Sequence, residues 1–578
     1  MRRTLRSRLR FITGVILLIA LFLIVRLYFV QVVQGKEYAL RGQHQYVSAS
    51  QQLYDRGTIY FTRKDGTLVS GAALATGFTL AIDPEQIKDA EAVYATLSKH
   101  LPLDRDAFTR AAAKTSDPYE VLATRVSEDI GHAISAEKIP GVIVELERWR
   151  VYPAGTEAAR LLGFVAYDDG NALAGRYGLE RYYETTLERS GNGLFGNFFA
   201  QLFANLGSVV ADAKSAREGD VITSIEPVVQ QKLDQILAAT NAQYSSQETG
   251  GIIMDPSTGA IIAADVVPSF DPNNFKGASA ELFGNPLVQH EYEFGSIFKT
   301  LTMASGLDAG VITQQTTYND TGCIEVNKSR ICNFDLKARG VIPMQEILNQ
   351  SLNVGASFVA TKLGHERFRQ YFTSLGLGEK TGVDLPSEVA GDIHNILTSP
   401  RDVEYDTASF GQGIATTPIE TMRALAALAG HGAIVTPHVA TAIRLENGIV
   451  KPLTYAAPRQ VFRTTTTDQL AKMLTIVVDT KLGHGTVKIP EMSVAAKTGT
   501  AQIAGPGGKY FANLYFHSFF GYFPASNPRY AILLYTREPQ GVQYASETLT
   551  APFMTMTHFL INYYDIPPDR ATFMKPAP

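Results

Sequence analysis

The first 33 residues restrict where the rest of this chain can fold. Five arginines and no acidic residue lie in the first ten positions, and an apolar run follows from Phe11 to Val33 with Arg26 as its one charge. An apolar stretch of about twenty residues spans a membrane once, and a basic flank marks the cytoplasmic side. A cleaved signal peptide is the alternative, but the small-residue cleavage pattern is missing. We therefore expect a basic cytoplasmic tail over residues 1–10, a transmembrane anchor over 11–33, and a remainder that folds outside the cytoplasm.

The composition excludes several classes of protein. Of 578 residues, 45% are hydrophobic and 19% are charged, with 48 glycines and 27 prolines, which excludes a disordered chain, a coiled coil and a polytopic membrane protein. The 52 basic and 56 acidic residues give a net charge of −4, so binding of nucleic acid has no electrostatic support. Two cysteines, together with histidines that lack ligand spacing, predict no metal site, and we expect no cofactor.

The two cysteines leave a question open. Cys323 and Cys332 lie nine positions apart in a segment that can form a hairpin. Outside the cytoplasm such a pair can form a local disulfide, which stabilises a chain mainly by restricting its unfolded state. Two free thiols are the alternative, and the sequence does not separate the two.

Beyond the anchor the chain divides into two regions. A hairpin is expected around Lys64–Gly66, and helical and strand patterns alternate from Ala90 to Arg150, which predicts an α+β module without a catalytic constellation. A second region begins near Glu218, with strand patterns at both of its ends and helical patterns between them. This order predicts a sheet built from distant segments and covered by helices. We assign the first region to residues 34–217 and the second to residues 218–570.

A phenylalanine-rich stretch, residues 194–206, precedes that boundary. Its apolar residues have helical spacing, which predicts an amphipathic helix packed on its own domain. Contact with the membrane surface or with another membrane protein is the alternative.

Ser296 and Lys299 form a Ser-x-x-Lys motif at the start of an apolar, helix-forming segment. One helical turn places both side chains on the same face. A serine hydroxyl becomes a good nucleophile when a base removes its proton, and a lysine can be that base if burial or a nearby cation lowers its pKa. The helix N-terminus also directs N–H groups toward a developing oxyanion. A second copy, Ser135–Lys138, ends at a proline and has no matching partners, so we interpret it as chance.

Two further motifs follow in order. Ser351–Asn353 lies in a loop that leads into a helix, where a Ser-x-Asn is commonly only a helix cap. Lys497–Thr500 is a Lys-Thr-Gly-Thr on an apolar strand, where the glycine lets a substrate backbone approach. Another Lys-Thr-Gly, Lys380–Gly382, lies in a loop rich in glycine and proline. Each motif is weak alone, but the three in this order and context predict one active site.

With these motifs the chain resembles a class B penicillin-binding protein, a monofunctional peptidoglycan D,D-transpeptidase, along nearly its whole length. The segments Asp55–Ile59 and Arg150–Glu184 resemble the N-terminal pedestal of that family, also called the dimerisation domain, and Phe410–Glu420 resembles a recurring segment of the transpeptidase domain. Ser-Leu-Asn-Val-Gly at Ser351–Gly355 is closer to the division-associated branch than to the elongation branch. The resemblance implies a membrane-anchored α+β protein whose pedestal is followed by a penicillin-binding transpeptidase domain, an antiparallel sheet covered by helices, similar to serine β-lactamases.

The resemblance implies a catalytic role for five motif residues. Ser296 would attack the penultimate D-Ala carbonyl of a donor stem peptide, with Lys299 as general base, and would become acylated. Ser351 would relay a proton to the leaving amine. Asn353 would orient Lys299 and the substrate amide. Lys497 would help to keep Lys299 neutral by like-charge repulsion.

The same resemblance implies a substrate-binding strand. Thr498 and Thr500, on either side of Gly499, would bind the terminal carboxylate of the D-Ala-D-Ala donor, and the N–H groups of Ser296 and Thr500 would form the oxyanion hole. An acceptor amine from a neighbouring strand would then attack the acyl-enzyme and form the cross-link. β-Lactams would acylate the same serine.

Partners and location follow from the resemblance too. The protein would be a single-pass protein of the bacterial cytoplasmic membrane, with its N-terminus inside and its catalytic domain on the periplasmic side. No glycosyltransferase motif is present, so sugar polymerisation would fall to a polytopic glycosyltransferase, alongside other division or elongation proteins. The alternatives are a serine β-lactamase or D,D-carboxypeptidase that hydrolyses the same acyl-enzyme, and a non-catalytic division scaffold or β-lactam sensor. The sequence leaves open the choice between division and elongation, the acceptor amine, the oligomeric state and the β-lactam preferences.

Overall fold

A computed structural model describes residues 54–167, 173–189, 218–505, 507 and 509–570. Within these residues no helix has the length and apolar character needed to cross a membrane. The predicted anchor (11–33) and the phenylalanine-rich stretch (194–206) lie outside the described residues. The chain forms two units, a smaller one that contains residues 76–149 and a larger one that contains 56–75, 150–189 and the chain from 207 onward.

The smaller unit is the predicted α+β module. Its elements are the second half of β2 (Leu68–Ile82), α3 (Ala90–Leu97), α4 (Arg105–Ala112), β3 (Glu120–Val126), α5 (Glu128–Ala136) and the main part of β4 (Val142–Val151). β3 and β4 both pair with β2, and the helices cover a core that includes Leu80 and Phe108. The side chains of Asp89 and Asp104 cap α3 and α4, because they accept hydrogen bonds from the N–H groups of Ala92 and Ala107 in each first turn.

One part of the larger unit holds a sheet in the order β16-β15-β7-β1-β2, to which distant segments of the chain contribute strands. The strands and short helices of this part are β1 (Ile59–Thr62), β5 (Val165–Tyr167), β6 (Leu173–Gly175), β7 (Gly219–Thr223), β15 (Ala440–Leu445), β16 (Val450–Pro452), α6 (Ala159–Leu162), α7 (Gly178–Tyr182) and α8 (Glu184–Leu187). β1 and β2 are antiparallel around Lys64–Gly66, which confirms the predicted hairpin. Glu180 of α7 is fully buried between two arginines, with Oε2 at 2.6 Å from Arg56 Nε and Oε1 at 2.6 Å from Arg150 Nε.

The rest of the larger unit is built on a five-stranded antiparallel sheet in the order β18-β19-β20-β8-β9. Its strands are β8 (Glu248–Met254), β9 (Ile261–Val267), β18 (Ala495–Ala504), β19 (Tyr510–Phe523) and β20 (Tyr530–Arg537). β8 pairs directly with β20, although the two are far apart in the sequence. The prediction of a sheet built from the two ends of this region is therefore confirmed, and β18 and β9 are its edge strands.

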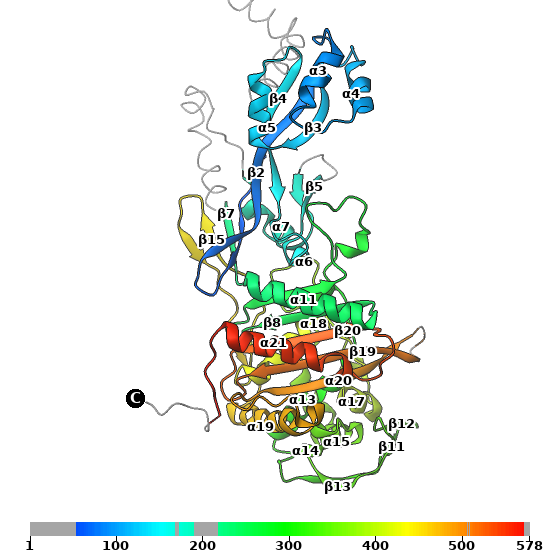
Figure 1. Ribbon diagram of the computed structural model, residues 1–578. Helices are drawn as coiled ribbons and strands as arrows, with labels where there is room; N and C mark the ends of the chain where they lie inside the picture. Colours follow the sequence, from blue (N-terminus) through cyan, green and yellow to red (C-terminus); the bar gives the residue numbers. More distant parts are fainter. Residues whose placement is uncertain (1–53, 168–172, 190–217, 506, 508, 571–578) are drawn as a thin grey trace, which may run out of the picture. The chain divides into compact units, whose positions relative to one another are not determined.

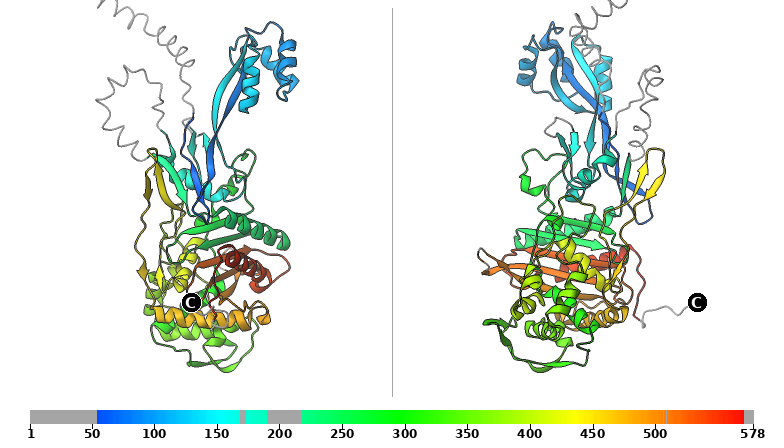
Figure 2. Two further views of the ribbon diagram at one scale, coloured as in Figure 1. Left: turned by 60° about the vertical axis from the view of Figure 1, so that its left-hand side comes forward. Right: turned by 180° about the vertical axis from the view of Figure 1, so that it is seen from behind.

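Helices cover both faces of this sheet. α11 (Pro227–Tyr244) and α21 (Thr550–Tyr563) lie on one face, over Ile253, Ile532 and Phe519 (Figure 1). The segment from residue 299 to 429 covers the other face, as the view from behind shows (Figure 2). Its main helices are α13 (Lys299–Asp308), α14 (Gln345–Asn349), α15 (Asn353–Ser374), α16 (His394–Thr398), α17 (Asp402–Ala408) and α18 (Pro418–Ala429), and α19 (Thr464–Thr480) packs along β18. Because both faces are covered, successive residues of β8 and β20 are buried, apart from the half-buried Glu248 and Arg537 at paired ends of the two strands.

Candidate active site

Ser296 lies on a one-turn 3₁₀ helix (Gly295–Phe298) that leads directly into α13, and Lys299 is the first residue of α13. Lys299 Nζ lies 3.0 Å from Ser296 Oγ. Gly295 adopts a left-handed backbone, with φ of +64°, and a Cβ there would lie 2.8 Å from the carbonyl oxygen of Thr500. The turn Gly295–Phe298, which we call the nucleophile turn after the predicted role of Ser296, is therefore held against β18.

Burial sets the electrostatics of Lys299. Its side chain is 1% exposed, and Nζ also lies 2.5 Å from the carbonyl oxygen of Ser351 and 3.2 Å from Ser351 Oγ. Burial, assisted by the positive charge of Lys497, holds the pKa of Lys299 well below its usual value. A lysine with a lowered pKa has a larger neutral fraction at pH 7, and the neutral amine can take the proton of a hydroxyl.

Ser351 lies in the turn between α14 and α15, with a left-handed φ of +56°. Its hydroxyl lies between two amines, 3.2 Å from Lys299 Nζ and 3.0 Å from Lys497 Nζ. A non-glycine residue in this backbone region is strained by about 1 kcal/mol or more, and such strain is concentrated at functional sites. Asn353 opens α15, and its amide nitrogen donates to the carbonyl oxygen of Cys332 at 2.8 Å. Its orienting role toward Lys299 stays a prediction.

The Lys-Thr-Gly-Thr motif lies on β18, as predicted. Lys497 is 3% exposed and donates to the carbonyl oxygen of Thr498 at 2.9 Å, and burial lowers its pKa to about 7. The Thr500 hydroxyl accepts a hydrogen bond from the Ala545 N–H at 3.0 Å. In register, Gly499 pairs with Ser518 of β19.

A groove of about 890 Å³ brings these residues to solvent. Ser296, Ser351, Asn353, Lys497, Thr498 and Thr500 all line it, whereas neither spurious copy, Ser135–Lys138 or Lys380–Gly382, contributes a lining residue. Among the residues that the structure describes, the lining also contains Arg330, Lys481 and His484 and no carboxylate side chain. A groove with fixed positive charge and no acidic group favours an anionic ligand.

Several groove residues were not predicted as site residues. Arg330 lies between the two cysteines, and Lys481 follows α19, where no motif marks them. The Phe410 ring lies 5.9 Å from Lys299 Nζ. Phe410 is in the segment that resembles the family's transpeptidase domain, which could have placed it near the site. Glu293, three residues before Ser296, accepts hydrogen bonds from the Gly413 N–H at 2.9 Å and the Tyr510 hydroxyl at 3.1 Å, and burial raises its pKa.

The close packing of Gly499 gives a first prediction. A Cβ on Gly499 would lie 2.5 Å from the Phe294 carbonyl oxygen and would also overlap Ser518 Oγ. We expect Gly499→Ala to displace the nucleophile turn, to destabilise the fold by about 1–3 kcal/mol and to lower the acylation rate of the folded protein. Thermal denaturation and β-lactam acylation kinetics measure the two effects.

Gly284→Ala is the matched control. Its Cβ would lie 2.7 Å from Gln289 Oε1, the end of a flexible side chain that can move away at the cost of the hydrogen bond from the Asn285 N–H at 3.1 Å. We expect wild-type acylation and at most a small loss of stability for this variant. Wild-type acylation by Gly499→Ala would contradict the packing argument.

Comparison with family models identifies both parts of the chain. Residues 249–556 match the penicillin binding protein transpeptidase domain, and residues 53–192 match the penicillin-binding protein dimerisation domain. Among curated proteins, the chain is 26% identical over 577 residues to the peptidoglycan D,D-transpeptidase FtsI of Escherichia coli K12, which covers 98% of this chain and 93% of that protein. It is also 26% identical over 564 residues to the stage V sporulation protein D of Bacillus subtilis, covering 95% of this chain and 84% of that protein.

Solved structures share the fold. Penicillin binding protein 2X of Streptococcus thermophilus superposes with a TM-score of 0.72 at 18% identity, covering 89% of this chain and 81% of that one. Penicillin binding protein 3 of Mycobacterium tuberculosis, in complex with aztreonam, superposes with a TM-score of 0.68 at 20% identity, covering 91% and 100%. At these identities the likeness is one of fold.

Proposed function

The chain belongs to the penicillin-binding transpeptidases, as a class B member of the division-type branch, and we propose that Ser296 is its acylated nucleophile and Lys299 the base that activates it. The protein is a serine D,D-transpeptidase of cell-wall synthesis. The observation that carries the assignment of these two residues is the 3.0 Å separation of Lys299 Nζ from Ser296 Oγ, with the pKa of Lys299 held low by burial.

In the first half-reaction, neutral Lys299 takes the proton of Ser296 while Oγ attacks the penultimate D-Ala carbonyl. The tetrahedral oxyanion accepts hydrogen bonds from the backbone N–H groups of Ser296 and Thr500. When the C–N bond breaks, the leaving D-Ala amine takes a proton through the Ser351 hydroxyl, which lies within hydrogen-bond distance of both lysines. The free D-Ala departs and an ester on Ser296 remains.

In the second half-reaction, an acceptor amine attacks that ester. Its proton returns through Ser351 and Lys299 to Ser296 Oγ, so the enzyme is regenerated and an amide cross-link replaces the lost peptide bond. Lys497 supports this cycle because its charge lowers the pKa of Lys299.

The donor's terminal carboxylate binds Thr498 and Thr500 beside Gly499. The basic groove lining supports this placement, because Arg330 and Lys481 attract a peptide carboxylate and no acidic side chain repels it. A β-lactam, which carries a carboxylate and a strained amide, acylates Ser296 in the same way and leaves a slowly hydrolysed ester.

Residues 11–33 anchor the protein in the cytoplasmic membrane, with residues 1–10 inside, the pedestal over 34–217 and the transpeptidase domain over 218–570 on the periplasmic side. The five N-terminal arginines and the apolar run support this arrangement. A polytopic glycosyltransferase in the same membrane supplies the glycan strands.

Labelling with a fluorescent penicillin tests the assignment. In membranes that contain the full-length wild type, we expect a label that persists for hours, because water hydrolyses the acyl-enzyme of a transpeptidase only slowly. Ser296→Ala removes the attacking oxygen, so we expect no label at equal protein abundance. Gel fluorescence after denaturation measures the covalent label.

Each other outcome has a distinct meaning. A label lost within minutes would identify a β-lactamase or D,D-carboxypeptidase. Full labelling of Ser296→Ala would assign the nucleophile elsewhere. An unlabelled but folded wild type would leave a non-catalytic scaffold.

A further inference from the structure

A disulfide-closed hairpin forms part of the groove rim. β11 (Cys323–Val326) and β12 (Ser329–Cys332) are antiparallel, and the disulfide joins Cys323 to Cys332 at the open end of the hairpin. The structure thus answers the question that the sequence left open. Arg330, Cys332 and Asn353 line the same groove. We propose that this disulfide and the adjacent Asn333 are positioning elements for Asn353, an inference that rests on the catalytic role proposed for Asn353.

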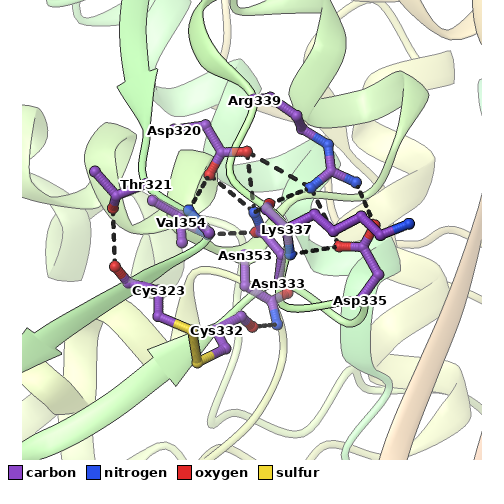
Figure 3. Close-up of a disulfide and its surroundings, with 11 residues drawn as sticks. Asp320, Thr321, Cys323, Cys332, Asn333, Asp335, Lys337, Arg339, Asn353 and Val354 are labelled. Carbon is purple, nitrogen blue, oxygen red and sulfur yellow. Dashed lines mark hydrogen bonds and ion pairs between the residues drawn. A yellow bond between two sulfur atoms is a disulfide. The ribbon is translucent and has the colours of Figure 1, made fainter.

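The disulfide acts on Asn353 through one hydrogen bond. The carbonyl oxygen of Cys332 accepts the Asn353 amide nitrogen at 2.8 Å (Figure 3). A carbonyl oxygen can only accept, so it selects the amide orientation in which the nitrogen faces Cys332. The amide oxygen of Asn353 then remains available to accept from Lys299 or from a substrate N–H.

Asn333 acts on the backbone beside Asn353. Its side chain is buried, and Oδ1 accepts the N–H of Val354 at 3.2 Å. This bond satisfies one of the free N–H groups in the first turn of α15, where a helix otherwise lacks acceptors. The Asn333 amide nitrogen donates to Asp320 at 2.8 Å, and its backbone N–H donates to Gly322 at 2.9 Å. Asn333 is therefore fixed from both sides.

The covalent link matters because the hairpin is small. Each strand has four residues, and the tip residues Asn327 and Lys328 have left-handed backbones with φ of 49° and 70°. An isolated two-stranded hairpin of this kind is marginally stable in water. The disulfide fixes the end next to Asn333, so its loss frees both contacts to the start of α15 at once.

Double-mutant kinetics of the full-length protein in membranes test this. The second-order rate constant for acylation by a fluorescent penicillin is measured for Asn333→Ala, for Cys323→Ser/Cys332→Ser, for Asn353→Ala and for each combined with Asn353→Ala. We expect a roughly 10- to 100-fold loss for Asn333→Ala and for the cysteine variant. In the Asn353→Ala background we expect no further loss, because residues that act through one group are not additive. Additive losses would overturn the proposal.

Reduction of the wild type avoids the risk that a variant fails to fold. Dithiothreitol transfers two electrons and two protons to the disulfide and closes to its own cyclic disulfide, and mass spectrometry of alkylated protein counts the two thiols formed. We expect the fully reduced wild type to be acylated at the rate of the cysteine variant. The rate of the cysteine variant itself should not change when dithiothreitol is added. An unchanged rate after complete reduction would overturn the proposal.

Thr321→Ala is the matched control. Thr321 lies at the same end of the hairpin, but its exposed hydroxyl donates only to the Cys323 carbonyl oxygen, at 2.8 Å. We expect a wild-type rate, and a loss equal to that of Asn333→Ala would contradict the role assigned to Asn333. Labelling of the wild type separates failure of the proposed function from failure of this inference. An unlabelled wild type would refute the proposed function, whereas a labelled wild type with unaffected variants would refute this inference alone.

Discussion

Replacing Lys299 with methionine is expected to lower the rate of acylation by about 10²- to 10⁴-fold, the usual contribution of a positioned general base. Lys299 Nζ lies 3.0 Å from Ser296 Oγ, and methionine fills similar space without a proton acceptor. Stopped-flow or quenched labelling with a fluorescent penicillin measures the rate. Lys362→Met, on an exposed position of α15, is the control and should acylate at the wild-type rate.

The pH dependence of the same variant tests the cause. In the folded state burial and Lys497 hold the pKa of Lys299 well below its ordinary 10.5. At pH values between the lowered pKa of the folded state and the ordinary pKa of the unfolded state, Lys299 is protonated in the unfolded chain and neutral in the folded one. Lys299 therefore makes the free energy of unfolding rise with pH across that interval. Lys299→Met should lack this rise, and wild-type acylation should increase with pH as the amine becomes neutral. A wild-type rate that does not fall as the pH is lowered through the folded-state pKa of Lys299 would contradict the role of Lys299 as the base.

Glu180→Ala is expected to destabilise the larger unit by about 3–5 kcal/mol, since it removes the carboxylate that pairs with buried Arg150 and one of the two carboxylates that pair with Arg56, the other being Glu184. Burial alone would raise the pKa of Glu180, but Arg150 and Arg56 outweigh it and lower that pKa. Alanine leaves both guanidinium groups without this carboxylate. The midpoint of chemical denaturation measures the loss.

Glu91→Ala is the matched control for that prediction. Glu91 pairs with Arg105 at 2.7 Å, but the two side chains are 68% and 63% exposed. Exposed pairs contribute about 0–1 kcal/mol. Equal destabilisation by the two variants would show that burial does not set the strength of the Glu180 cluster.

Local patterns predicted much of this fold. The spacing of Ser296 and Lys299 sets their geometry within one helical turn, so sequence alone could pair them. Ser351 approaches Lys497 across 146 positions, and only the order of the motifs indicated that contact. The local context set aside the copies at Ser135 and Lys380, and neither contributes a lining residue to the groove.

Residues whose role depends on tertiary contacts were not predictable. Asn333 belongs to no sequence motif. Its proposed role depends on hydrogen bonds to Val354 and Asp320, which pattern and propensity do not encode. Glu180 belonged to a recognised segment, but its two arginine partners are 124 and 30 positions away. Arg330 carries no motif because a rim charge has no preferred spacing.

The basic lining of the groove acts on ligands before any bond forms. Arg330 and Lys481 line the groove, whose described lining residues include no carboxylate, so an anion inside the groove is attracted by these side chains. Such a field speeds diffusional encounter at low ionic strength and is screened over about 8 Å at physiological salt. Capture of an anionic substrate is therefore expected to weaken as the ionic strength of the surrounding solution rises, whereas salt screens the buried lysines much less.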